Sequence, residues 1–169
     1  MRLSKLFFVL MTVGILVGSS DSPVAAGSAT ANLNVSATVS ANCTISTAPV
    51  AFPAYDPIAT HASANDDGTG TVTITCTKGT AATIGLGLGA NASGSQRRMK
   101  DATTDYLNYA LYLDGGRTTI WGTASPNLLA PVAAPDKSPR PFTVYGRIPF
   151  AQDVPAGAYT DTVVAAVNF

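Results

Sequence analysis

The chain has 169 residues, no net formal charge at pH 7, and charged side chains at only 12% of its positions. All ten acidic residues are Asp, and the sequence contains neither a basic patch nor an acidic tail, so its composition argues against binding to nucleic acid. Gly and Pro occur 15 and 11 times, and Thr, Val and Ala are abundant, which is typical of a β-protein with many turns.

Residues 1–26 have the features of a secretory signal peptide. Two basic residues are followed by an apolar run at 6–17, and small residues precede the expected cleavage site after Ala26. A retained membrane anchor is the alternative, although the run is short for a bilayer span. The mature chain, residues 27–169, has the length of one ordinary domain.

The two cysteines predict a disulfide bond. In an exported protein an even pair is most simply explained as one bridge, here between Cys43 and Cys76. Closing this loop would contribute about 3–4 kcal/mol through chain entropy. Each cysteine lies in a strand-like stretch, so we expect the bridge to join two strands. Together with the single histidine, His61, they provide too few ligands for a zinc site, and we expect no metal or cofactor.

Alternation of apolar and polar residues predicts short strands along most of the mature chain. The stripes lie at residues 33–41, 43–46, 71–76, 84–88, 107–113, 142–148 and 163–169. A hairpin turn is expected at residues 114–117, followed by a further strand at 118–121. Residues 122–141 are predicted to form a long loop or a poorly ordered crossover. This pattern favours an all-β antiparallel sandwich without a helix.

Both ends of the mature chain are strand-like segments without an obvious neighbour. The alternating segment before Cys43 starts almost directly after the predicted cleavage site, and residues 161–169 stop within an apolar strand. An unpaired apolar strand leaves a sheet edge that soluble proteins normally cover. Periodicity leaves two interpretations open: the first segment pairs with the last strand of its own chain, or it is a free strand that joins another molecule.

Several motifs in order resemble the spore coat protein U family, which also contains the major subunits of archaic chaperone–usher pili. They are TANLNVSATVSANCTI at 30–45, LNYALY at 107–112 with DGGRTT at 114–119, VYGRIP at 144–149, and VPAGAYTDTV at 154–163 with the final Phe169. The resemblance covers nearly all of the mature chain. It implies an immunoglobulin-like sandwich that lacks its last strand and is completed by donor-strand exchange.

The resemblance also assigns roles to particular residues. The donor segment would be residues 27–42, merging into the first strand somewhere between Ser36 and Asn42, and the sandwich would be residues 43–169. The plugs of the donor strand would be Leu33, Val35, Ala37 and Val39. The acceptor groove and chaperone contact would include Val163, Val167 and Phe169. The terminal carboxylate on Phe169 is a candidate anchor for a basic chaperone residue.

The implied partners are identical or related pilin subunits, a periplasmic chaperone and an outer-membrane usher, and no nucleic acid. The implied function is that of a structural pilus or fimbrial subunit, exported through the periplasm to the cell surface and supporting adhesion and biofilm formation. A spore or cyst coat protein is the first alternative, since the family name covers both.

Two alternatives come from other functional classes. A carbohydrate-binding module or adhesive tip could use Trp121, Tyr106 or Tyr112, although aromatic residues on strands more often belong to the core or to cross-strand pairs. An enzyme finds little support. His61 stands alone in what we expect to be a surface loop, and the pair at 66–67 fits a turn before Gly68 better than acid–base catalysis. We expect no catalytic residues.

Overall fold

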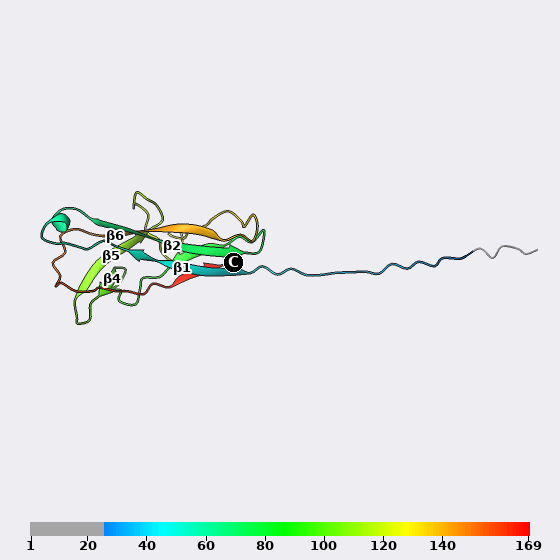
Figure 1. The fold of residues 1–169 in the computed structure, drawn as a ribbon, viewed down its shortest axis with the longest axis horizontal. Coiled ribbons are helices and arrows are strands. Elements are labelled where there is room, and N and C mark those ends of the chain that lie inside the picture. The colour runs from blue at the N-terminus through cyan, green and yellow to red at the C-terminus, as the bar shows by residue number, and fades with distance from the viewer. Residues whose placement is uncertain (1–25) are drawn as a thin grey trace, which may run out of the picture. The chain divides into compact units, whose positions relative to one another are not determined.

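The structure, a computed structural model, describes residues 26–169 (Figure 1). The predicted signal peptide therefore lies outside the described residues, apart from Ala26. The chain divides into two units, Met1–Ala37 and Thr38–Phe169. The second unit contains β1 (Cys43–Ala51), a short 3-10 helix η1 (Thr60–Ala62), β2 (Asp66–Cys76), β3 (Thr83–Leu86), β4 (Arg97–Lys100), β5 (Tyr106–Tyr112), β6 (Arg140–Ile148) and β7 (Ala165–Asn168). Within residues 26–169, no helix has the length and apolar character to cross a bilayer.

Five strands form an antiparallel sheet in the order β1-β2-β6-β5-β4. Strand β2 shows why these residues form a sheet. Its side chains alternate, so Val72, Ile74 and Cys76 are buried while the threonines between them face the other side. The sequence predicted this alternation, and the structure confirms it.

A second antiparallel pair, β3 and β7, supplies the other layer. Ile84 of β3 lies opposite Val167 of β7. On its other edge, the backbone of Ile84 exchanges two hydrogen bonds with Leu129, so the long segment after Trp121 contributes an ordered contact. Residues from both sheets form one hydrophobic core, in which Trp121 is fully buried and donates its indole N–H to the Ile84 carbonyl at 2.9 Å. The predicted all-β antiparallel fold class is confirmed.

Arg97 of β4 is a charged residue inside this core, with 3% of its surface exposed. Its guanidinium donates hydrogen bonds to three backbone carbonyls, those of Leu86, Gly87 and Trp121, at 2.7–2.9 Å. These carbonyls lie where β3 ends and where the chain enters the long loop. Burial lowers the pKa of Arg97. The three hydrogen bonds offset part of the cost of burying the charge.

Several local predictions were wrong. Residues 33–41, expected as a strand, form none, and the short helix η1 was not expected. Strand β4 was not predicted, because Arg97 to Lys100 show no apolar alternation. Residues 118–121 form no strand, and only Ile120 makes an isolated bridge, to Tyr112. The acids at 66–67 begin β2 instead of forming a turn; Asp67 can occupy a strand because Arg147 on β6 neutralises it with two hydrogen bonds of 2.7 and 2.9 Å.

His61 was a further error, since it is buried in η1 and not exposed in a loop. Its ring stacks on Tyr55 with centroids 4.8 Å apart. Its Nδ1 accepts a hydrogen bond from the Asp56 amide at 2.8 Å. These two contacts hold together the loop that connects β1 to β2. The buried position of His61 therefore has a structural explanation.

Candidate functional site

The outer strands β1 and β7 each have an open edge. Among the described residues, β1 pairs only with β2 and β7 only with β3. The two strands approach each other across the layers, and β7 ends beside the start of β1 (Figure 1). Their free edges present unpaired backbone donors and acceptors, which an additional strand would satisfy.

An apolar groove of about 220 Å³ lies between these two strands. Its walls come from residues 47–52 on one side and from Asp161, Val163 and Ala165 on the other. Its floor is made by core side chains, namely Val72, Leu86, Met99, Tyr109, Leu111 and Val144. The groove therefore lies directly over the hydrophobic core.

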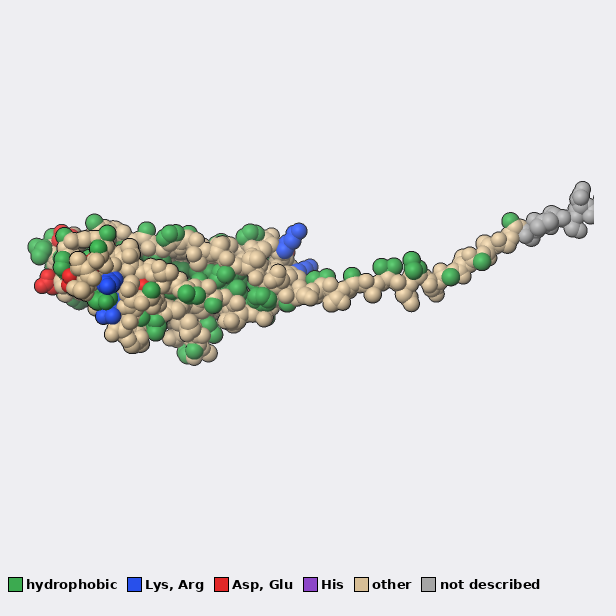
Figure 2. All heavy atoms as spheres, turned by 90° about the horizontal axis from the view of Figure 1, so that it is seen from below, with side chains coloured by type: hydrophobic (Ala, Val, Ile, Leu, Met, Phe, Trp, Pro, Cys, Tyr) green, Lys and Arg blue, Asp and Glu red, His purple; other side chains and the backbone are tan. Residues whose placement is uncertain are grey.

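A second hollow, of about 680 Å³, continues the groove towards the loops after β1. Val50, Phe52 and Met99 line both hollows, so the two are neighbouring sections of one trough. On the face drawn in Figure 2, apolar side chains lie among backbone and uncharged polar atoms. We call the two sections together the apolar trough.

Glycines in the sheet allow β1 to form its wall. A side chain at Gly146 of β6 would meet Phe52 Cζ at 2.6 Å and Val50 Cγ1 at 2.7 Å. A side chain at Gly70 of β2 would also meet Val50, at 2.7 Å. The register of β1 on β2 shifts between Ala48 and Ala51, which moves the end of β1 over the sheet. The absence of side chains below therefore lets Val50 and Phe52 pack directly on the backbone.

A partly buried polar contact fixes the opposite wall. The hydroxyl of Tyr109 donates to Asp161 Oδ2 at 2.6 Å, and both the backbone and the side-chain N–H of Asn91 donate to Asp161 Oδ1 at 3.1 Å. Desolvation, reinforced by the hydrogen bond to Asp161, raises the pKa of Tyr109. The phenol is therefore a stable neutral donor that holds the segment before β7 against β5.

The segment before β1 is exposed. No strand is assigned to residues 26–42, and Leu33, Val35 and Val39 expose 87%, 86% and 81% of their surface, with Ala37 exposed as well. Polar residues alternate with these four predicted plugs. An extended conformation would consequently place the four on one face.

The three predicted acceptor residues occupy different positions. Val163 lines the groove. Val167 packs against the core opposite Ile84 and does not belong to the groove lining, while Phe169 follows β7 and is 56% exposed. The larger wall, residues 47–52, was missed by the sequence reasoning; the apolar Val50 and Phe52 next to prolines were the available signal.

The predicted disulfide is present. Cys43 and Cys76 lie directly opposite each other at the start of β1 and the end of β2, with Cα atoms 4.1 Å apart. The bridge fixes one end of the open strand β1 to the sheet. Among residues 26–169, no cluster of three metal-ligating side chains is found.

Two of the three aromatic residues considered for sugar binding have structural partners. Trp121 belongs to the core, as the alternative interpretation required. Tyr106 lies on β5, and Arg98 of β4 stacks over its ring at 4.0 Å.

These features define an all-β sandwich domain with an open apolar trough between two unpaired strand edges. The model of the Spore Coat Protein U domain matches residues 29–166, and the chain belongs to this family. The resemblance of the sequence motifs is thereby confirmed. The match begins within the exposed segment before β1, so this segment is part of the family's domain.

Two known proteins are similar to the chain. Protein U of Myxococcus xanthus is 40% identical over 161 residues, covering 88% of this chain and 89% of that protein. The fold is similar to that of a chain in the complex of the chaperone CsuC with the tip adhesion subunit CsuE, from archaic chaperone–usher Csu pili of Acinetobacter baumannii. There the TM-score is 0.59 at 23% identity, over 78% of this chain and 41% of that chain. The chain thus spans less than half the length of that structural relative, and this likeness concerns the fold.

Proposed function

We propose that this chain is the repeating subunit of a surface fibre that assembles by donor-strand exchange. The observation that carries the proposal is the apolar trough between β1 and β7, together with an exposed segment of strand-like alternation before β1. An extended segment entering the trough would fill the hollow above the core and pair with both free edges. Residues 27–42 of one copy are the donor, and residues 43–169 of the next copy are the acceptor.

The energy of this exchange comes from side chains and backbone together. Leu33, Val35 and Val39 are almost fully exposed, and burying a large aliphatic side chain contributes about 1.5–3 kcal/mol. Ordering the segment and joining two molecules cost part of this gain. Backbone hydrogen bonds on two edges would make release slow, because they must break together.

The proposal includes a route to the surface. A free trough leaves two strand edges unpaired beside an apolar hollow, so the subunit needs a temporary partner before it polymerises. A periplasmic chaperone would fill the trough, with Val163, Val167 and Phe169 as its contacts, and an outer-membrane usher would exchange it for the next subunit. The predicted signal peptide supplies export, and the fibres would support adhesion and biofilm formation.

Denaturing electrophoresis of material sheared from the cell surface tests the proposal. Without boiling, strand-exchanged polymers should give a ladder of bands, and boiling should collapse the ladder to one band. A single monomer band in both lanes, with the protein free in the periplasm or medium, would overturn it. A self-complemented carbohydrate-binding domain would then be the better hypothesis.

A deletion separates the donor role from a structural role of the same residues. Removing residues 27–40 should leave a subunit that folds with its chaperone but cannot join a polymer. If the shortened chain fails to fold even with the chaperone, the segment is a strand of its own domain and the donor model is wrong.

A coat protein of a spore or cyst is the second candidate, favoured by the family to which the chain belongs. The same strand exchange would serve a coat. Genes for a chaperone and an usher beside this one would favour the fibre, and immunogold labelling confined to a spore or cyst wall would favour the coat.

A further inference from the structure

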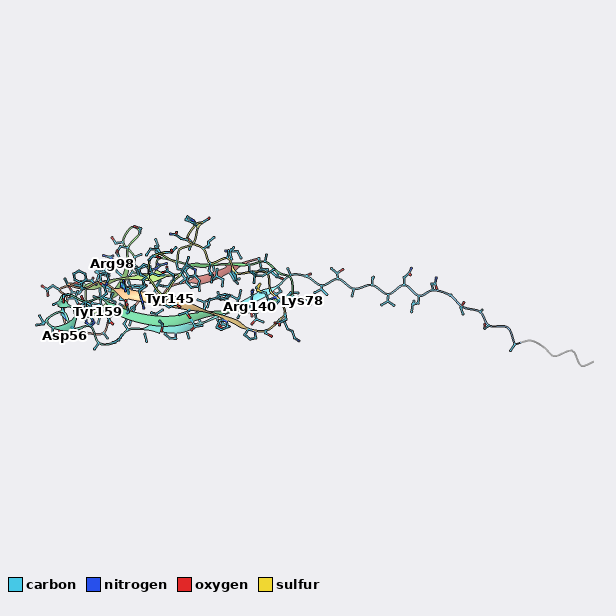
Figure 3. The ribbon with its side chains drawn as sticks, turned by 90° about the horizontal axis from the view of Figure 1, so that it is seen from above. Asp56, Lys78, Arg98, Arg140, Tyr145 and Tyr159 are labelled. Atoms are coloured by element: carbon cyan, nitrogen blue, oxygen red, sulfur yellow. A yellow bond between two sulfur atoms is a disulfide. The ribbon has the colours of Figure 1, made fainter. Side chains whose placement is uncertain are left out.

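The domain of residues 38–169 has two ends of different chemistry. Strand β2 runs from Asp66 at one end to Cys76 at the other, with Ile148 and Arg140 of β6 at the corresponding ends. We call these the Ile58 end, formed by residues 52–66 and 148–159, and the Cys43 end, where β1 starts and β2 stops. Figure 3 places Asp56 at the first end and Lys78 and Arg140 at the second. In the view of Figure 2, acidic side chains gather towards one end, while one group of basic side chains lies at the other end and a second group lies near the acidic ones.

The Cys43 end contains an open hollow of about 560 Å³ beside the disulfide. Asn42, Thr44, Thr75, Cys76 and Thr77 line it together with Lys78, Asp136 and Lys137. Because the lining contains two lysines and one aspartate, the rim of the hollow has a net positive charge.

The Ile58 end carries a projecting apolar side chain next to a carboxylate. Ile58 is 87% exposed. Asp56 Oδ1 accepts hydrogen bonds from the amides of Ile58 and Ala59 at 2.9 and 3.1 Å, which fix the loop and lower the pKa of Asp56. Phe150, 51% exposed, lies at the same end, since its amide is bonded to Asn65. The end is therefore an ordered apolar projection with a negative charge beside it.

Strand exchange brings one end of the donor subunit against one end of the acceptor subunit. The direction of the donor strand in the trough determines which two ends meet. Strand β1 runs from the Cys43 end to the Ile58 end, and β7 runs the opposite way. If the donor strand runs antiparallel to β7, its last residues lie at the Ile58 end of the acceptor. The Cys43 end of the donor subunit then lies next to that Ile58 end, because Cys43 directly follows the donor segment. A donor antiparallel to β1 would instead bring two Cys43 ends together, with their lysines facing each other, and like charges in contact oppose association.

We propose that the hollow beside the disulfide is a docking site for the Ile58 loop of the next copy of this chain. Ile58 enters the hollow, and Asp56 lies against the rim formed by Lys78 and Lys137. The contact is head-to-tail, so the same pair of surfaces repeats along the fibre. It rests on the proposed strand exchange and adds a second interface that sets the angle between neighbouring subunits.

Crosslinking in intact fibres tests the contact. The chain has two cysteines, both in the disulfide, so introduced thiols react selectively. Fibres of an Ile58→Cys, Lys137→Cys double variant are treated with a short bis-maleimide and boiled. A ladder that survives boiling is expected from the double variant and from neither single variant. A second double variant, Phe150→Cys with Lys137→Cys, should also give a ladder that survives boiling. It replaces the first pair if Ile58→Cys impairs assembly. Ile58→Cys with Thr118→Cys, in the turn after β5, is the control pair that should give no ladder.

The unboiled lane distinguishes the two proposals. One outcome is that the two test pairs, Ile58→Cys with Lys137→Cys and Phe150→Cys with Lys137→Cys, give a heat-sensitive ladder but no heat-resistant one. That result is consistent with strand exchange and overturns the docking contact. A heat-resistant dimer from Lys137→Cys alone means that two Cys43 ends meet, and it also overturns the contact. If no variant and not even the wild-type chain gives an unboiled ladder, strand exchange fails and the docking contact fails with it.

Discussion

Tyr109 in β5 and Asp161 before β7 are 52 positions apart in the chain, yet the phenol hydroxyl donates a 2.6 Å hydrogen bond to the carboxylate. Both side chains line the groove, so this bond joins its floor to one of its walls. Gly89 is part of the arrangement. It has a positive φ of 93°, and a side chain there would collide with Asp161. This wall of the groove therefore depends on a specific polar contact as well as on apolar packing.

Removing the hydroxyl should loosen this wall. We expect Tyr109→Phe to lower the free energy of unfolding by about 1–3 kcal/mol, because a partly buried carboxylate oxygen loses its donor. Urea unfolding of residues 27–169, followed by the emission of the buried Trp121, measures the change. Tyr112→Phe on the same strand is the matched control, since no hydrogen bond of its hydroxyl is found within the described residues. Equal losses in both variants would show that Tyr109 acts only through its ring.

Gly146 tests the opposite wall. Gly146→Ala would place a methyl group where Val50 and Phe52 now lie, and we expect a loss of about 1–3 kcal/mol from overpacking. Gly157→Ala should cost much less, because its new atom would meet only Tyr159 at 4.0 Å. Thermal unfolding of the two variants side by side gives the comparison. A wild-type melting temperature for Gly146→Ala would mean that the end of β1 moves freely over the sheet.

Most of the strands could be predicted because their side chains alternate between core and surface. The stripe of β2 is a pattern of this kind. The turn beginning at Asp114 follows from its local residues, and the disulfide follows from the presence of two cysteines. Strand β4 could not be predicted. Its Arg97 is buried only because three carbonyls from β3 and the long loop converge on it, and no local pattern in the sequence shows that convergence.

The candidate site shows the same division. Val163 lines the groove, and the family resemblance, together with the apolar stripe at 163–169, had pointed to it. The groove positions of Val50 and Phe52 were not predicted, because they depend on Gly146 and Gly70 in two other strands. His61 was expected at the surface for a related reason, since its stacking partner and its hydrogen-bonding amide come from the loop geometry.

Neighbouring aspartates at the start of β2 should respond to pH in opposite ways. Burial raises the pKa of Asp66, whereas the hydrogen bonds from Arg147 lower the pKa of Asp67. An acid with a raised pKa costs stability as the pH rises through that pKa. An acid with a lowered pKa contributes stability above its ordinary value of about 3.9, and this contribution is lost as the pH falls through the lowered pKa.

Two substitutions separate these effects. Relative to the wild-type chain, Asp66→Asn should gain stability between pH 3 and pH 7, and Asp67→Asn should lose it over the same range. Because Asp67 is partly exposed, its loss should stay within about 1 kcal/mol. Urea unfolding at the two pH values measures both, and differences that do not change with pH would contradict the assignment.

The donor segment can be tested on alternate residues of one stretch. Leu33→Asp would place a charge on the apolar face of the segment, and burying an unpaired carboxylate in the trough is strongly unfavourable. We expect this variant to abolish the heat-sensitive ladder of sheared material. Asn34→Asp introduces the same charge one position later, on the opposite face of an extended strand, and should leave the ladder intact. Loss of the ladder in both variants would point to a general effect of charge on export, which the periplasmic level of the chaperone-bound subunit would show. Ladders in both would mean that Leu33 does not enter the trough.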